Sequence, residues 1–140
     1  MNSWVFIDKP KNITSFAVIK RLKKILNIKK IGHSGTLDPF ATGILAIALG
    51  EATKSIRYFN QNKVYKFNVV FGELKDTDDI TGKTIKKSNI IPTLSEIDKC
   101  IEKFIGKHKQ VPPQFSAAKV NGKRAYKLAR NNQKFELKAK

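Results

Sequence analysis

Several residue types and patterns are scarce in this chain, and each absence excludes a class of protein. One cysteine, Cys100, is present among 140 residues, which excludes an intramolecular disulfide framework and a cysteine-based metal cluster. No apolar run approaches the roughly 20 residues that a membrane-spanning helix needs. The N-terminal stretch MNSWVFIDKPK lacks the basic and then apolar regions of a secretory signal. We therefore expect a cytoplasmic protein with no membrane partner.

Acidic residues are also scarce, and this leaves a large positive charge. The chain has 11 Asp and Glu against 28 Lys and Arg, a formal net charge of +17. Residues 9–30 hold eight basic residues and no acid, and residues 99–140 hold twelve basic residues against two acids. Such blocks suit a polyanion, because each neutralised phosphate releases condensed counterions. The alternative is a lysine-rich surface that only interacts with water, and charge alone leaves both interpretations open.

Apolar patterning predicts one folded domain of mixed structure. Apolar residues make up 41% of the chain, which is enough for a core. Strands are predicted over residues 4–8, 44–49, 64–71 and 83–87. Helices are predicted from Ser15 to about Leu26 and over 51–59, 93–105 and 125–131. Asn121-Gly122 predicts a tight turn between residues 116–120 and 123–126. Because strands and helices do not alternate strictly, we expect an α+β fold with a mixed, mostly antiparallel sheet flanked by helices.

For two of these elements the sequence also predicts which side chains face the core. In the strand at 64–71, Tyr65 and Phe67 alternate with polar residues and are expected to point toward the core. In the helix at 93–105, Ile101 and Phe104 are expected to face inward, with Gly106 ending the helix.

One carboxylate has an unusual setting. Asp38 lies in GHSGTLDPFATG, residues 32–43, within a basic and apolar part of the chain. An Asp-Pro pair commonly opens a turn in which the carboxylate accepts hydrogen bonds from nearby backbone amides. Alternatively, Gly32, Gly35 and Gly43 let the backbone approach a ligand closely. The surrounding lysines would then keep the carboxylate ionised and attract phosphates.

Other chemistries fit this segment less well. A P-loop needs Lys and a hydroxyl residue at the start of its helix, and the residues after Gly43 supply neither. A hydrolase triad of Ser34, His33 and Asp38 is disfavoured, because adjacent His and Ser side chains project in different directions. Taken alone, His33 is as well explained by an imidazole that caps or hydrogen-bonds within the fold.

Metal binding is also disfavoured by the residues present. Zinc needs more ligands than His33 and the distant His108 provide. The aspartates of residues 76–79 resemble part of a calcium loop, but Thr81 and Lys87 occupy positions where that loop needs glycine and glutamate. We interpret residues 76–82 as a polar turn.

Four segments resemble one enzyme family. GHSGTLDPFATGILAIALGEATK closely resembles the signature of bacterial tRNA pseudouridine synthases of the B type, which isomerise the T-loop uridine at position 55. VFIDKPKNITSF resembles the family's opening Lys-Pro motif, and VYKFNVVFG with KDTDDITG resembles the next block. QVPPQFSAAKVNGKRAYKLAR, residues 110–130, resembles a further one. The blocks occur in collinear order along essentially the whole chain, so the resemblance is specific.

The resemblance implies a role for several residues. It makes Asp38 the catalytic aspartate, Tyr65 the platform that stacks on the flipped base, and His33 the residue that helps to extrude the nucleotide and occupy its place. Lys9 and Pro10 match a motif that supports the active-site loop. The full set of implied substrate-binding residues is His33, Tyr65, Lys9, Gly32 and Gly35. The family's reaction needs no metal and no organic cofactor.

The chemistry of the implied reaction explains these residue types. The enzyme breaks the N1–C1′ bond, turns the uracil and rejoins it through C5. A carboxylate can stabilise or trap the positive charge at C1′, as in a retaining glycosidase, or act as a base on the sugar. The sequence leaves both roles open. Flipping the base out costs a few kcal/mol, which stacking on an aromatic ring partly returns.

The resemblance also implies what lies outside these residues. Relatives continue with a Lys-Gly-Thr-Tyr-Ile-Arg-like strand, whose arginine pairs with the catalytic aspartate, and most bacterial members add a small RNA-binding domain. Residues 1–140 contain no such strand. We therefore expect the N-terminal portion of a catalytic domain, with an incomplete sheet, no C-terminal RNA-binding domain and weak or no activity alone. A C-terminal half or partner chain would complete it.

The expected partner is tRNA, bound through its T arm. The alternative is a non-catalytic basic RNA-binding fragment, which would keep the basic surface without the chemistry. The two hypotheses differ in whether tritium is released from 5-labelled uridine.

Overall fold

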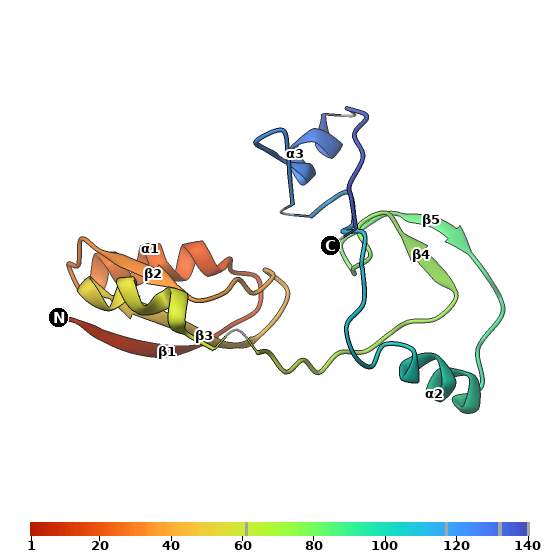
Figure 1. Cartoon of the computed structure of the whole chain (residues 1–140), viewed down its shortest axis with the longest axis horizontal. Helices are drawn as coiled ribbons and strands as arrows, with labels where there is room; N and C mark the ends of the chain where they lie inside the picture. The colour runs from red at the N-terminus through yellow and green to blue at the C-terminus, as the bar shows by residue number, and fades with distance from the viewer. Residues whose placement is uncertain (61, 117, 132, 140) are drawn as a thin grey trace. The chain divides into compact units, whose positions relative to one another are not determined.

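The computed structural model describes residues 1–60, 62–116, 118–131 and 133–139. The chain forms two compact units, Met1–Lys66 and Phe67–Lys140 (Figure 1). Every strand pairing in the described residues is antiparallel, which confirms the predicted α+β class. No helix among these residues combines the length and the apolar character that crossing a bilayer would require.

The first unit is built on a three-stranded sheet in the order β1-β3-β2. The strands are β1 (Ser3–Lys9), β2 (Ile31–His33) and the central β3 (Gly43–Leu49). Because β3 has a neighbour on each side, its residues from Leu45 onward are all buried. The sequence predicted β1 and β3. It did not predict β2, which is three residues long and contains a glycine.

Helix α1 (Ser15–Ile25) covers one face of this sheet (Figure 1). Its Val18 and Ile19 form the core with three side chains of β3: Leu45, Ile47 and Leu49. Full burial of such a side chain contributes about 1.5–3 kcal/mol. The Thr14 side chain caps the helix by accepting a hydrogen bond from the Ala17 amide at 3.0 Å. The predicted helix is therefore confirmed, with Thr14 as its N-cap.

The 3₁₀ helix η1 (Gly50–Tyr58) lies on the opposite face and provides the predicted short helix. Trp4 of β1 connects to it. The indole Nε1 of Trp4 donates to Ser55 Oγ at 3.2 Å, and its ring stacks on Phe59 with centroids 4.6 Å apart. Since Trp4 is the single tryptophan of the chain, its fluorescence reports on this unit.

The second unit consists of short elements. Their bounds are β4 (Glu73–Lys75), β5 (Thr84–Lys87), α2 (Leu94–Glu102), β6 (Lys119–Val120), β7 (Lys123–Arg124) and α3 (Ala125–Arg130). The pairs β4–β5 and β6–β7 form hairpins. Asn121 and Gly122 connect β6 to β7 with φ angles of 48° and 79°, as a tight hairpin turn requires.

Two sequence predictions are wrong. Residues 64–71 form no strand, and the side chains of Tyr65 and Phe67 are 64% and 76% exposed. Helix α2 ends at Glu102, before Gly106, and Ile101 and Phe104 are 57% and 74% exposed. The alternation and the helical spacing describe one apolar face, but such a face is buried only when another element packs against it.

Candidate active site

Asp38 lies on the loop that joins β2 to β3, at the end of the sheet where β1 finishes. The Asp38 carbonyl accepts a hydrogen bond from the Ala41 amide at 3.1 Å, so the predicted Asp-Pro turn is present. The Asp38 side chain is exposed, and within the described residues its carboxylate has no hydrogen bond or ion pair. The turn thus uses the backbone of Asp38 and leaves its carboxylate available.

The residues on both sides of Asp38 are bound to the start of α1 and to the segment before it. Ser15 Oγ accepts from the Leu37 amide at 2.9 Å and donates to the Leu37 carbonyl at 3.1 Å. The Pro39 carbonyl accepts from the Asn12 amide at 2.7 Å. The Leu37 side chain also packs against the core. The carboxylate is therefore carried by a backbone that is held on each side.

Lys9 supports the loop through hydrogen bonds from its buried side chain. Its side chain is completely buried, and Nζ donates to the carbonyls of Pro10 at 3.0 Å, Ile13 at 2.9 Å and Pro39 at 3.3 Å. These three oxygens replace the water that a buried ammonium group loses. This geometry agrees with a loop-supporting role for the Lys-Pro motif. It corrects the grouping of Lys9 with the substrate-binding residues, because the ammonium group is not accessible to a substrate.

His33 ends β2 and is half-buried. Its Nδ1 forms a hydrogen bond with the Gly35 carbonyl. Since a carbonyl only accepts, Nδ1 must carry the proton in this contact, which makes Nε2 of a neutral ring the acceptor. The imidazole is thus held within the loop, as the alternative interpretation of His33 proposed, and one nitrogen remains for a further contact.

The two glycines near His33 have close neighbours. A Cβ on Gly32 would lie 2.9 Å from Ile56 Cδ1 of η1. A Cβ on Gly35 would lie 3.2 Å from Lys63 Cε, near the end of a flexible side chain. The packing of the protein itself therefore explains the lack of a side chain at Gly32, and a lysine passes close over Gly35.

The different neighbours predict different effects of alanine at these positions. Gly32→Ala should lower the free energy of unfolding by about 1 kcal/mol, because Ile56 must shift to admit the methyl group. Gly35→Ala is the matched control and should have little effect, since the Lys63 chain can move aside. Urea unfolding followed by Trp4 fluorescence measures both. Equal midpoints for the two variants would contradict this explanation.

Among the described residues, no hydrogen bond, ion pair or ring contact joins Tyr65 to the loop. It lies in the exposed segment that follows η1, in the first unit but outside its sheet. The register places Lys9 opposite Gly43, at the start of β3, and Gly32 opposite Ala48, near its end. The predicted site residues other than Tyr65 are thus spread along the sheet and the β2–β3 loop, and Tyr65 belongs to a separate segment. Sequence reasoning missed Ser15 and Asn12. The available signal was the Thr14-Ser15 pair, in which one hydroxyl suffices to cap a helix.

Asp76 and Asp79 accept hydrogen bonds from other residues of their own turn. Asp76 accepts from the Lys83 amide at 2.8 Å, and Asp79 accepts from Thr77 Oγ1 at 2.8 Å and the Thr81 amide at 2.7 Å. Burial acts to raise the pKa of Asp79, but hydrogen bonds from Thr81 and Thr77 outweigh it and hold that pKa below its usual value. The interpretation as a polar turn agrees with this geometry, and no described residues form a metal-binding group of three or more His, Cys, Asp or Glu.

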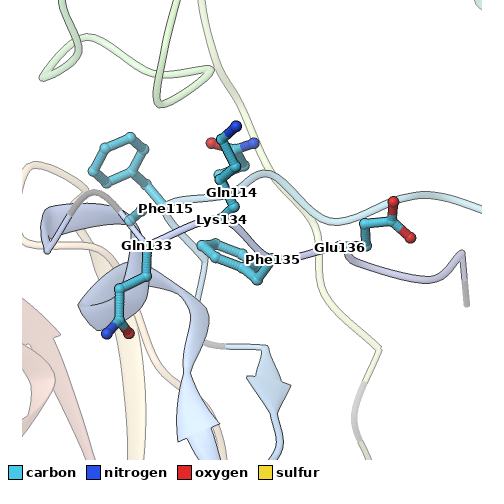
Figure 2. Close-up of a pocket in the computed structure, with 7 residues that line it drawn as sticks. Gln114, Phe115, Gln133, Lys134, Phe135 and Glu136 are labelled. Atoms are coloured by element: carbon cyan, nitrogen blue, oxygen red, sulfur yellow. The ribbon is translucent and has the colours of Figure 1, made fainter.

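The second unit contains a cavity of about 710 Å³ that the sequence did not predict. Figure 2 shows that Phe115 and Glu136, on its lining, point in different directions. The complete lining is Gln114, Phe115, Ala129, Gln133, Lys134, Phe135 and Glu136. Since its polar side chains do not converge and it contains no predicted site residue, the Asp38 loop is the better candidate.

Fold and site together define an α+β protein with an available carboxylate on a loop held at both sides, in a strongly basic chain. The model of the TruB family pseudouridylate synthase N-terminal domain matches residues 23–140. The chain belongs to this family, which confirms the resemblance found in the sequence.

Relatives and solved structures agree with this family. The tRNA pseudouridine synthase B of Ehrlichia ruminantium (strain Gardel) is 56% identical, over 100% of this chain and 48% of the relative. That of Roseobacter denitrificans (strain ATCC 33942 / OCh 114) is 48% identical, over 100% of this chain and 46% of the relative. A chain in the crystal structure of a Cbf5-Nop10-Gar1 complex aligns with a TM-score of 0.56 and 29% identity, covering 83% of this chain and 30% of that chain. The chain spans about half the length of the curated relatives it matches.

Proposed function

We propose that this chain is the N-terminal part of the catalytic domain of a tRNA pseudouridine synthase and that Asp38 is its catalytic residue. The proposed substrate is the T-loop uridine of cytoplasmic tRNA. In the reaction the N1–C1′ bond breaks, the uracil turns, and a C5–C1′ bond forms. N1 gains a proton and C5 loses one to solvent, so the reaction needs no oxidant or reductant.

The observation that carries this proposal is the state of the Asp38 carboxylate. It is exposed and without a hydrogen bond in the described residues, while the backbone of Leu37 and Pro39 is held. A nucleophile at C1′ and a base on the sugar both need an ionised carboxylate that no other group occupies. A held backbone also reduces the entropy lost when the carboxylate meets the ribose.

Charge supports RNA as the substrate. The net charge is +17, and the exposed side of α1 carries Lys20, Lys23 and Lys24 with no acidic residue on the helix. Lysines of this kind attract phosphates and bring the RNA to the loop. We propose that Tyr65 stacks on the extruded base and that His33 contacts the RNA through Nε2. The exposure of Tyr65 is compatible with a base binding to its ring.

The proposal is tested with a T-arm stem-loop that carries tritium at C5 of its uridines. The protein tested is the full product of its gene, because residues 1–140 by themselves are expected to have weak or no activity. We expect tritium release, and we expect RNA binding that weakens as the salt concentration rises. Salt-sensitive binding without release would reject the enzyme and support the non-catalytic RNA-binding fragment. If the protein neither binds the RNA nor releases tritium, both the enzyme and the RNA-binding fragment are rejected.

A further inference from the structure

We propose that Ser15 is a positioning residue of this site: its buried hydroxyl holds Leu37 and thereby sets the direction of the Asp38 carboxylate. The inference rests on the proposed function of Asp38. Ser15 belongs to α1 and is separated from Leu37 by 22 positions in the sequence. It therefore ties the loop to the helix that packs on the core of this unit.

The Ser15 hydroxyl is not needed to start the helix. Thr14 is the N-cap, and its side chain accepts from the Ala17 amide at 3.0 Å. Ser15 is the first helical residue, where the backbone amide needs no partner within the helix and alanine has a higher helix propensity than serine. The two adjacent hydroxyls thus have separate tasks: Thr14 caps the helix, and Ser15 binds the loop.

The geometry of the Ser15 hydroxyl suits it to hold one residue. A hydroxyl has one proton to donate and lone pairs that accept, and here both functions are directed at Leu37. The oxygen accepts from the Leu37 amide at 2.9 Å and donates to the Leu37 carbonyl at 3.1 Å. Two bonds from one atom resist rotation of the backbone on both sides of Leu37. The carbonyl belongs to the peptide unit that leads into Asp38, so its orientation is passed on to that residue.

The surroundings of Ser15 are buried, so the hydrogen bonds of its hydroxyl are not readily replaced. Ser15 is 2% exposed, and the Leu37 side chain packs against the core. If the hydroxyl is removed, the Leu37 amide and carbonyl lose these partners and the backbone can turn to find others. The carboxylate then moves away from the position that the ribose requires, while the basic surface that binds RNA stays unchanged.

The test compares Ser15→Ala with Thr14→Ala, its matched control. Tritium release at saturating protein gives the rate constant, and filter binding gives the RNA Kd. We expect Ser15→Ala to lower the rate constant by about 10-fold to 100-fold, the range that a displacement of about 1 Å produces, with the Kd unchanged. Thr14→Ala should lower the urea midpoint and keep the rate constant. Ser15→Cys, which keeps a weak donor and acceptor, should fall between Ser15→Ala and the wild type.

Amide hydrogen exchange gives a second readout that does not depend on activity. The Leu37 amide should be protected in the wild type and in Thr14→Ala, and it should lose protection in Ser15→Ala. A wild-type rate constant in Ser15→Ala, or equal losses in Ser15→Ala and Thr14→Ala, would overturn the positioning role. Failure of the wild-type protein to release tritium would instead overturn the proposed function, and Leu37 exchange would then still show whether Ser15 holds the loop.

Discussion

Replacing Asp38 with asparagine should abolish turnover and leave RNA binding intact. The amide has nearly the same size but cannot ionise, so it can neither stabilise positive charge at C1′ nor act as a base. We expect the rate of tritium release to fall on the order of 10⁴-fold or more, as the loss of a catalytic nucleophile or base does in other enzymes. The loop should keep its structure, because the turn uses the Asp38 carbonyl and not its carboxylate.

Binding measurements separate this effect from a loss of affinity. The RNA Kd should stay within about threefold of the wild type, and any change should be toward tighter binding, because a negative charge is removed near phosphates. Asp98→Asn is the control: Asp98 is an exposed aspartate of α2, and its replacement makes the same charge change in the other unit of the chain. Ordinary turnover by Asp38→Asn would refute the assignment of Asp38.

Replacing Lys9 with methionine should cause the largest loss of stability among these variants. Methionine fills a similar volume but donates no hydrogen bond, so the Pro10 and Ile13 carbonyls lose the ammonium group and Pro39 keeps only Asn12. A hydrogen bond to a charged group contributes about 1.5–3 kcal/mol. Relief of the buried charge offsets part of this loss, and we expect the free energy of unfolding to fall by about 3 kcal/mol.

Urea unfolding followed by Trp4 fluorescence measures this loss, because the Trp4 ring is stacked in the same unit. Lys11→Met is the matched control. Lys11 is exposed in the same segment, and its replacement should leave the midpoint nearly unchanged. If both variants unfold at the same urea concentration, the buried ammonium group of Lys9 does not support the loop.

The elements that the sequence predicted well are those with local signals. The apolar run of β3 and the spacing of Ile19 and Leu22 in α1 express burial directly, because these residues do face the core. Phe16 and Leu26 belong to the same helical spacing but are 71% and 36% exposed. The tight turn at Asn121-Gly122 was predictable for a different reason. Few residue pairs adopt two positive φ angles without strain, so the residue types alone indicate the conformation.

The predictions that failed concerned which face an element buries. Tyr65 and Phe67 alternate as in a half-buried strand, yet residues 64–71 form no strand. A strand needs hydrogen bonds from a second segment, and the alternation contains no information about where that segment is. Ile101 of α2 is exposed although its spacing is helical. The spacing marks an apolar face, but it contains no information about which element would cover that face.

By itself, the sequence determined the family, the α+β class and the positive charge, and it singled out Asp38 as the candidate catalytic carboxylate, because these depend on residue types and local order. Only the tertiary structure decided that the Lys9 ammonium group is buried against the Pro39 carbonyl, that Ser15 binds Leu37, and that the Asp38 turn leaves its carboxylate available. These contacts join residues 22 and 30 positions apart. Hydrogen bonds over such separations exist only after the core has brought the two segments together, so no local pattern encodes them.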